Sequence, residues 1–263
     1  MNKTNIEYLD FTSNPLAMRC TPVSSGCANC WHLRVVDRLK NNPKIALKEK
    51  MAYAGVWPPV IREKELRAPL RMQKPSMIGL QLMGDLFHKQ VEWPTIDKIL
   101  LSCQIAQQHT HLILTKRIET AFYYFRSPVY GPESQIMHRS DFLKNNRIWV
   151  GVSVEDERSL EERGRVLKEI PAKKRFLSIE PMLEEMSLNE FDVHWESFID
   201  WIIIGAETGP GARVMRLQWL YKIVAECIKA RVPVFVKAIS QNGRPFSEFK
   251  KYPSFARRRE YPE

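Results

Sequence analysis

Three cysteines lie close together near the start of this 263-residue chain. Cys20, Cys27 and Cys30 fall in the stretch TSNPLAMRCTPVSSGCANCW with the spacing C-x6-C-x2-C. Three thiolates on one loop can hold a metal centre and leave one coordination position open for a reacting molecule. An odd number of closely spaced cysteines indicates metal binding or redox chemistry in a reducing compartment. Cys103 and Cys227 stand alone in segments with helical apolar spacing, which predicts two buried thiols.

Composition and charge narrow the class of protein. Hydrophobic residues make up 44% of the chain, enough for a large core, and α/β barrels of this length commonly form one domain. The 40 basic side chains against 30 acidic ones favour a polyanionic partner. No apolar run approaches the ~18 residues that span a bilayer, and the first ten residues lack the features of a signal peptide. We therefore expect a cytoplasmic protein with no membrane interaction and with one domain over residues 1–263.

Short apolar runs alternate with longer amphipathic segments along the chain. This alternation predicts parallel strands joined by helices. The predicted strands cover residues 6–11, 78–83, 112–115, 148–154, 175–179, 201–205 and 232–236. The predicted helices cover residues 31–40, 95–108, 157–169 and 217–230. Between them, residues 12–31 form the cysteine loop, 41–75 an insert of irregular structure or a short helix, 126–146 a candidate lid, and 244–263 a basic tail.

Polar residues follow the predicted strands. In parallel α/β folds, ligands gather at the carboxyl ends of the strands. If the charged residues had no function, we would expect them at both ends of the sheet. Their position after the carboxyl ends of the strands therefore predicts a site at that end. The residues concerned are Gly84, Asp85, His88, Lys116, Arg117, Glu155, Asp156, Glu180, Glu207, Arg213 and Lys237.

Two pairs among these residues suggest roles by their chemistry. Lys116 and Arg117 can clamp a carboxylate or a phosphate, since arginine offers a bidentate fork, or they form a solvated pair at the strand end. A carboxylate such as Glu180 that points into a barrel mouth needs a cation or a ligand. We expect Lys237 to be that cation by direct pairing.

The segment GAETGPGAR is rich in glycine but has neither the Walker pattern nor the dinucleotide-binding pattern. Its glycines allow backbone amides to approach a ligand closely, with Glu207 and Arg213 on either side of that ligand. The alternative interpretation is a tight structural turn.

Taken in order, the segments SNPLAMRCTPVSSGCANCW, GDLFH, LTKR, VGVSVEDERSLEER, SIEPML and GAETGPGAR resemble a family of phage and bacterial proteins with a three-cysteine motif. That family is of unknown function and is described as radical SAM-like. The resemblance implies a partial parallel (β/α) barrel of six to seven strands, with the cluster loop after the first strand. It also implies a 4Fe-4S cluster on Cys20, Cys27 and Cys30 that chelates S-adenosylmethionine and reductively cleaves it to a 5′-deoxyadenosyl radical.

The resemblance implies cofactor contacts at three further places. Gly84 and Asp85 would receive the methionine amino group, and Ser153 and Glu155 would contact the ribose or the methionine carboxylate. For Asp85 the alternative is a helix N-cap, and for Glu155 it is the first turn of the helix that starts near Asp156. A flavodoxin-like or ferredoxin-like reductant protein would supply the electron.

The cysteine motif departs from the usual radical SAM pattern. The gap between the first two cysteines is longer than the usual three residues, and Asn29 stands where an aromatic residue is expected, with Trp31 after the last cysteine. We interpret Pro22 and Gly26 as loop-shaping residues that let the longer gap fold back.

A structural zinc site is the alternative for the three cysteines. Zinc accepts Cys3His ligation, and His32 or His88 is the candidate fourth ligand. No fourth ligand stands at a usual zinc-finger spacing, which favours the iron–sulfur interpretation.

The basic tail KKYPSFARRREYPE places Lys250, Lys251 and residues 257–259 beside aromatics. This composition fits electrostatic and stacking contacts to nucleic acid, although such a tail is commonly a solvated terminus. Our sequence-based hypothesis is a radical SAM-like enzyme that modifies or repairs a nucleic-acid base or nucleoside. A target base in a duplex would have to be flipped out. The alternative is a non-enzymatic, zinc-containing nucleic-acid-binding protein.

Overall fold

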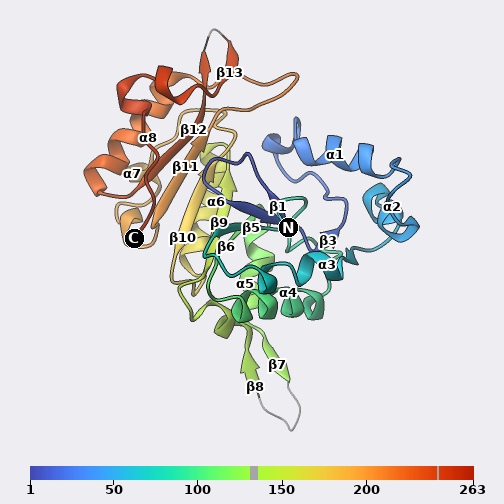
Figure 1. Cartoon of the computed structure of the whole chain (residues 1–263). Helices are drawn as coiled ribbons and strands as arrows, with labels where there is room; N and C mark the ends of the chain where they lie inside the picture. Colours follow the sequence, from blue (N-terminus) through green and yellow to red (C-terminus); the bar gives the residue numbers. More distant parts are fainter. Residues whose placement is uncertain (131–135, 242) are drawn as a thin grey trace. The chain divides into compact units, whose positions relative to one another are not determined.

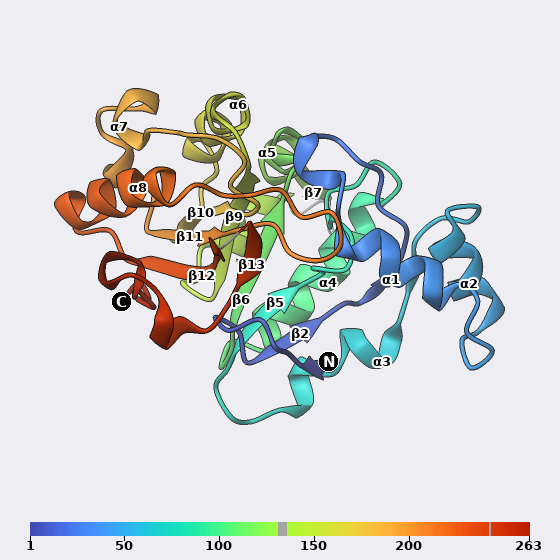
Figure 2. The same ribbon diagram turned by 90° about the horizontal axis from the view of Figure 1, so that it is seen from above.

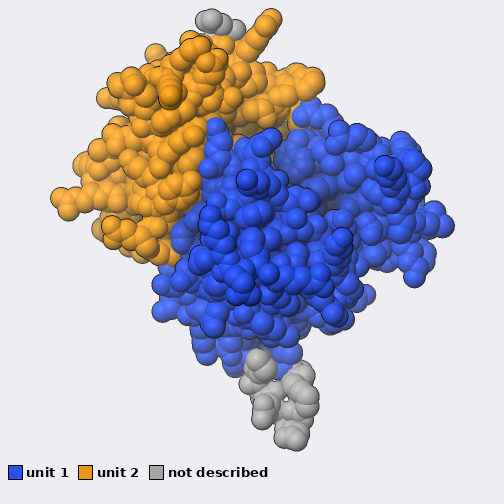
Figure 3. Space-filling view, viewed as in Figure 1, with its two compact units in different colours: residues 1–22, 30–150, 170–173 blue, residues 23–29, 151–169, 174–263 orange. Residues whose placement is uncertain are grey.

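The computed structural model describes residues 1–130, 136–241 and 243–263. These residues form two compact units, coloured separately in Figure 3. Unit 1 comprises residues 1–22, 30–150 and 170–173, and unit 2 comprises residues 23–29, 151–169 and 174–263. Each unit is built from separate segments of chain, so the division does not mark two consecutive domains. The prediction of one domain stays a prediction.

The main sheet has nine strands, most of them parallel, in the order β1-β2-β5-β6-β9-β10-β11-β12-β13. Helices alternate with these strands along the chain (Figure 1), which confirms the predicted α/β fold with parallel strands. The strands are β1 (Asn2–Lys3), β2 (Phe11–Ser13), β5 (Met77–Leu80), β6 (Thr110–Thr115), β9 (Ile148–Val154), β10 (Arg175–Ile179), β11 (Trp201–Gly205), β12 (Val234–Gln241) and β13 (Arg244–Phe246).

In unit 1, strand β5 pairs in parallel with both β2 and β6. A second, two-stranded sheet joins β3 (Leu16–Ala17) to β4 (Val60–Ile61). The helices of this unit are α1 (Trp31–Leu39), α2 (Leu47–Ala54), α3 (Glu63–Leu66), α4 (Trp93–Ile105) and α5 (Ile118–Arg126), with the short 3-10 helices η2 (Pro69–Arg71) and η4 (Arg139–Leu143). Helix α4 turns Ile96, Ile99, Leu100 and Cys103 inward at helical spacing.

In unit 2, strand β11 pairs in parallel with β10 and β12, and all five of its residues are buried. Helices α7 (Leu188–Phe191) and α8 (Leu217–Ala230) lie beside each other along these strands (Figure 2). Helix α8 buries Leu220, Ile223, Val224 and Cys227, the spacing of one helix face. The remaining helices are η1 (Ser25–Cys27), α6 (Glu157–Lys168), η5 (Trp195–Ser197), η6 (Phe249–Lys251) and η7 (Ser254–Ala256).

The predicted elements agree with the structure where the hydrophobic pattern is strong. Strands β9, β10 and β11 and helix α8 have the predicted bounds, and Cys103 and Cys227 are buried as predicted. All seven residues of β9 are buried, as expected for a strand covered on both faces. Among the described residues, no helix is long and apolar enough to cross a membrane.

Other predicted bounds were wrong. The first strand does not cover residues 6–11, because the backbone N–H of Leu9 closes a turn on the carbonyl of Ile6 and the strand begins at Phe11. The last parallel strand begins at Val234 and runs on to Gln241. The insert at 41–75 contains the short helices α2 and α3, in agreement with the predicted alternative of a short helix, whereas the sequence pattern missed α5.

The candidate lid at 126–146 contains a hairpin of β7 (Pro128–Tyr130) and β8 (Ile136–His138), followed by η4. Residues 131–135 of this segment lie outside the described residues. A role as a lid stays a prediction.

The basic tail is part of unit 2 and contacts strand β12. Strand β13 pairs antiparallel with β12, and Phe235 forms an isolated antiparallel bridge with Arg259. Tyr252 is 2% exposed, and its hydroxyl donates to the carbonyl oxygens of Lys237 and Phe246. The Arg259 guanidinium lies 4.2 Å from the ring centre of Phe249. The tail is therefore anchored by Tyr252 and Arg259, while Lys250, Lys251 and Arg257 are exposed, as expected for a solvated terminus.

Candidate functional site

A buried carboxylate organises the site in unit 1. Asp85 is 4% exposed and accepts four hydrogen bonds. Its Oδ1 accepts from the Phe87 N–H at 3.0 Å and the Thr115 hydroxyl at 2.8 Å. Its Oδ2 accepts from the Lys116 N–H at 3.2 Å and from Arg117 Nη1 at 3.0 Å. These donors fill the roughly four acceptor positions of a carboxylate.

This arrangement corrects one sequence-based alternative. Asp85 is no helix N-cap, because the next helix, α4, starts at Trp93 with Glu92 as its N-cap residue. Asp85 instead closes a turn onto Phe87 and joins the loop after β5 to the loop after β6.

Gly84 has a structural reason to be glycine. Its φ is +122°, a backbone conformation that other residues rarely adopt. A Cβ atom added there would lie 2.8 Å from the sulfur of Met18. The close approach of Met18, two residues before Cys20, brings the start of the cysteine loop against the loop that carries Asp85.

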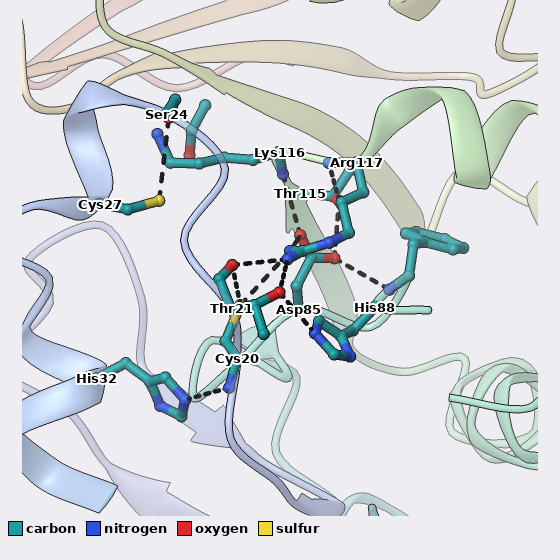
Figure 4. A network of polar contacts seen from close by, with 12 residues as sticks. Cys20, Thr21, Ser24, Cys27, His32, Asp85, His88, Thr115, Lys116 and Arg117 are labelled. Atoms are coloured by element: carbon teal, nitrogen blue, oxygen red, sulfur yellow. Dashed lines mark hydrogen bonds and ion pairs between the residues drawn. The ribbon is translucent and has the colours of Figure 1, made fainter. Parts of the chain in front are cut away.

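Arg117 connects this carboxylate to the first cysteine (Figure 4). Its Nη1 donates to Cys20 Sγ at 3.4 Å as well as to Asp85. Its Nη2 donates to the carbonyl and the hydroxyl oxygens of Thr21 at 2.7 and 3.0 Å. Burial lowers the pKa of Arg117, but the charges of Asp85 and Cys20 outweigh burial and raise that pKa above its ordinary value. The guanidinium of Arg117 therefore binds the cysteine loop. It does not form the solvated pair with Lys116 that was the alternative prediction.

Two histidines flank the same part of the loop (Figure 4). His88 Nδ1 accepts from the Gln90 N–H at 3.3 Å, so its Nε2, 3.0 Å from the Thr21 hydroxyl, carries the proton of the neutral ring. His32 Nε2 accepts from the Cys20 N–H at 3.2 Å. Burial, with a smaller effect from Arg19, lowers the pKa of His32 to about 4 and keeps that ring neutral.

The three loop thiols are half-buried. Cys27 Sγ lies 3.9 Å from the Ser24 hydroxyl. Within the described ranges, no three side chains of His, Cys, Asp or Glu are gathered closely enough to hold a metal ion. Cysteine thiolates are nevertheless the donor set that iron–sulfur clusters use, so the donor chemistry of Cys20, Cys27 and Cys30 fits such a group.

In unit 2, a second arginine–carboxylate pair belongs to the glycine-rich loop. Glu207 is 6% exposed, and its Oε2 accepts from both the backbone N–H and Nε of Arg213 at 2.8 Å. Arg213 Nη2 completes a bidentate contact with Oε1 of Glu207. These hydrogen bonds from Arg213 lower the pKa of Glu207 to about 2. The two side chains predicted to flank a ligand therefore bind each other.

This pair also holds the cysteine loop. Arg213 Nη2 donates to the Ser25 carbonyl at 3.0 Å. Asn29 Nδ2 donates to Glu207 Oε2 and to the Gly211 carbonyl, both at 3.0 Å. Gly211 has φ +75°, which places its carbonyl within reach of Asn29. An aromatic residue at position 29 would lose both hydrogen bonds, which explains this departure from the expected motif.

The loop is tied to helix α6 as well. The Ser25 hydroxyl donates to Asp156 Oδ2 at 3.1 Å, while Asp156 Oδ1 accepts from the Ser159 N–H at 2.8 Å as the N-cap of α6. Glu155 is fully buried and pairs with Arg163 at 2.9 Å. Arg163 also donates to the Ser153 carbonyl at 2.6 Å. Asp156 is therefore the N-cap of α6, and Glu155 is engaged by Arg163 from the second turn of that helix.

Glu180 and Lys237 form the pair that the sequence predicts. Lys237 Nζ lies 2.6 Å from Glu180 Oε2, and Ser178 donates to Oε1 at 3.3 Å. An added Cβ at Gly205 would lie 2.8 Å from Glu180 Oε2, so the glycine leaves room for the carboxylate. Lys237 stands inside β12, not after its end as predicted.

The sequence interpretation missed several partners of the predicted residues. Thr21 and Ser25 lie inside the cysteine loop and make their contacts through backbone carbonyls as well as hydroxyls, which no residue pattern identifies. Arg163 had a usable signal, because it stands two helical turns after Asp156 on a helix that begins beside Glu155.

Comparison with known proteins gives one match. A family model described as a protein of unknown function (DUF5131) matches residues 3–254. No curated protein and no solved structure matches the chain.

Proposed function

The chain belongs to the DUF5131 family of proteins of unknown function, and we propose that it is a radical SAM-like iron–sulfur enzyme. Cys20, Cys27 and Cys30 would hold a 4Fe-4S cluster together with S-adenosylmethionine. When bound, these groups supply the electron and the sulfonium whose reductive cleavage starts radical chemistry. The proposed substrate is a nucleic-acid base or nucleoside, and the proposed electron donor is a flavodoxin-like or ferredoxin-like protein.

The contact between Arg117 and Cys20 is the observation that carries this proposal. A guanidinium donor at 3.4 Å stabilises the thiolate form of a cysteine, and the thiolate is the form that binds iron. Asp85 fixes the guanidinium from a buried position, and the Thr21 contacts set its direction. A surface thiol without function needs no such support.

The rest of the loop is held in the same manner. Arg213 and Glu207 bind Ser25 and Asn29 on either side of Cys27. Such outer contacts orient metal ligands and are needed for tight metal binding. The cysteine loop therefore has supports before and after its second thiol, as a preformed ligand loop requires.

The strand order supports the barrel part of the proposal. From β2 to β12, each strand of the main sheet neighbours the next one along the chain. A (β/α) barrel follows chain order in this way, whereas a doubly wound sheet reverses its order near the middle. We propose a partial parallel (β/α) barrel of the radical SAM type.

Residue roles toward S-adenosylmethionine are part of the same proposal. Gly84 and Asp85 remain the proposed receptor of the methionine amino group, which binds Asp85 only by replacing one of its four donors. Lys116 remains a candidate to bind a carboxylate or a phosphate. Glu155 has no exposed surface, and we assign it to positioning α6 through Arg163. Ser153 stays a proposed ribose contact, and Glu207, Arg213, Glu180 and Lys237 stay proposed binding and catalytic groups.

The zinc alternative is less well supported. Both ring nitrogens of His88 are engaged, by Gln90 and by Thr21, and His32 already uses Nε2 to accept from Cys20. Either histidine would have to give up a contact that shapes the loop before it ligated zinc.

Anaerobic reconstitution of the full chain with iron and sulfide tests the proposal. We expect about four iron and four sulfide per chain, the content of one cubane cluster, and release of 5′-deoxyadenosine when reductant and S-adenosylmethionine are added. Replacing Cys20, Cys27 or Cys30 by alanine should abolish iron retention. The matched control is Cys227→Ala, which removes a buried thiol far along the chain. Retention of zinc in place of iron, or equal iron in all four variants, would overturn the proposal.

A further inference from the structure

The helices that follow the cysteine loop present an unusual surface within unit 1. Helix α1 begins at Trp31, the residue after Cys30, and α2 follows it. The two helices pack on a small core of Ala17, Val36, Ala52 and Tyr53 with Leu39 and Ile45 against it. We call residues 31–57 the helical pair. The inner face of the helical pair is thus buried in this small core, whereas its outer face is exposed.

The outer face of α1 carries an indole and two guanidinium groups. Trp31, Arg34 and Arg38 are all exposed, and Trp31 exposes 46% of its surface. Their spacing of three and four residues places them on one side of the helix. Val36 and Leu39 occupy the opposite side, in the core. The three exposed side chains therefore form one stripe along α1.

The charges of the helical pair are strongly one-sided. It contains six Lys and Arg residues against two acidic ones. Both acidic side chains are already neutralised, Asp37 by Arg19 and Lys40, and Glu49 by Arg62. Among the described parts of the chain, the remaining basic side chains make no ion pair: Arg34, Arg38, Lys44, Lys48 and Lys50. The pair therefore presents five cations without compensating charge.

We infer that the exposed surface of the helical pair, with the stripe of Trp31, Arg34 and Arg38 along α1, binds single-stranded nucleic acid. Uncompensated Arg and Lys side chains bind phosphates by releasing counterions, and arginine forks match phosphate geometry. Exposed indoles stack on unpaired bases, and Trp57, at the end of the pair, is also 46% exposed. An acidic protein would be attracted by the same cations but would make no use of two exposed indoles for stacking.

The inference moves the nucleic-acid contact away from the basic tail. The tail's aromatic Tyr252 is buried, and Arg259 lies over Phe249, so these groups are engaged within unit 2. The inference deepens the proposed function by naming the surface for its substrate class, and on the nucleic-acid class it rests on that proposal. Binding of nucleic acid to the helical pair requires neither the cluster nor S-adenosylmethionine. An experiment can therefore contradict this inference without contradicting the proposed function, and the reverse also holds.

Fluorescence anisotropy of a labelled single-stranded DNA of about 16 nucleotides, near the upper end of common site sizes, tests the inference on the full chain. We expect Arg34→Ala/Arg38→Ala to weaken binding about tenfold or more. Each lost phosphate contact should also reduce the slope of log K against log salt by about 0.7, or about 1.4 for the pair. Trp31→Ala should weaken binding and reduce the quenching of indole fluorescence, because only Trp57 of the helical pair then remains to stack, and Trp31→Phe should restore part of the affinity.

The matched control is Lys250→Ala/Lys251→Ala, which removes the same charge from the tail. Its affinity should stay within about twofold of the wild type, since net charge alone acts weakly at physiological salt. Equal weakening by both double variants would overturn the inference, because binding would then follow net charge. Displacement of the DNA by polyglutamate at equal charge, with no effect of Trp31→Ala, would overturn it in favour of an acidic protein partner.

Discussion

Arg117 donates one hydrogen bond to the sulfur of Cys20 and another, from the same nitrogen, to the buried carboxylate of Asp85. Asp85 also accepts a hydrogen bond from the backbone N–H of Lys116, the residue before Arg117. The carboxylate therefore holds both the guanidinium of Arg117 and the backbone next to it. A thiol beside such a fixed cation has a preferred position and a preferred charge. Cys20, a proposed cluster ligand, is thus held in place by contacts within the protein itself.

Replacing Arg117 by lysine tests this role. Lysine keeps the positive charge but lacks the planar fork, so it cannot bind Cys20, Thr21 and Asp85 together. Loss of an outer contact of this kind typically weakens metal affinity about 10–100-fold. Iron retained after reconstitution and challenge with a chelator should fall accordingly. Arg126→Lys, at an exposed position of α5, is the control and should retain wild-type iron. Unchanged retention in Arg117→Lys would show that charge alone suffices.

Asn29 should matter for the stability of the loop. Its amide donates to Glu207 and to the Gly211 carbonyl. Asn29→Ala removes one charge-assisted and one neutral hydrogen bond, which predicts a loss of about 1–3 kcal/mol in the free energy of unfolding. Asn29→Asp should cost more at neutral pH, because it sets a second carboxylate against Glu207, whose low pKa keeps it ionised. Urea unfolding measures both.

The pH dependence of Asn29→Asp checks the cause. As the pH falls through the range where the new carboxylate gains a proton, its repulsion of Glu207 disappears and the variant should approach Asn29→Ala. Asn145→Asp, which keeps the acceptor used by the Arg147 N–H, is the control and should show no such change. A pH-independent difference would mean that shape, not charge, is responsible.

The buried pair of Glu155 and Arg163 gives a third prediction. Glu155→Gln or Arg163→Met leaves a buried partner without its counter-charge, a change that typically costs about 3–5 kcal/mol of unfolding free energy. The double variant Glu155→Leu/Arg163→Met should recover much of this loss, since a buried ion pair can be replaced by apolar side chains at little cost. Urea unfolding of the single and double variants measures the coupling. Additive losses, or single variants of normal stability that fail to bind S-adenosylmethionine, would contradict a positioning role and favour a ribose contact.

Hydrophobic pattern determined how much of the fold was predictable. Strands such as β9 and β11 are continuous apolar runs between turn signals, so their bounds follow from sequence. Helix α5 begins directly after Arg117, and its run of aromatics hides the helical period. The strand at 6–11 failed because the same residues suit a turn, and hydrogen bonding between Leu9 and Ile6 decides the outcome.

The candidate site was predictable by residue type but not by partner. Glu180 and Lys237 pair as predicted, because each needs the other's charge in a half-buried position. Asp85 and Glu207 were expected to face a ligand, yet each binds an arginine of its own unit. Sequence shows that a carboxylate stands at a strand end. The sequence does not show which basic residue forms an ion pair with that carboxylate in the folded protein.

A buried histidine predicts how stability depends on pH. His111 lies in β6 without exposed surface, 3.4 Å from the Ala106 carbonyl, and burial lowers its pKa to about 4. In the unfolded chain its pKa is near 6.5, so the unfolded state binds more protons between these values. Stability from the neutral ring is complete above about pH 6.5 and is lost as the pH falls toward 4. The contribution is at most about 3 kcal/mol, from 1.36 kcal/mol per pKa unit.

The measurement is urea unfolding of the wild type and His111→Gln between neutral pH and pH 4. The wild type should lose more unfolding free energy over this interval than the variant, because glutamine has no proton to gain. Carboxylates that titrate in the same range affect both proteins equally, so the difference isolates the histidine. His194→Gln, at an exposed position, is the control and should follow the wild type. Parallel curves for the wild type and His111→Gln would mean that His111 is already protonated in the folded state, or that the strand opens to water at low cost.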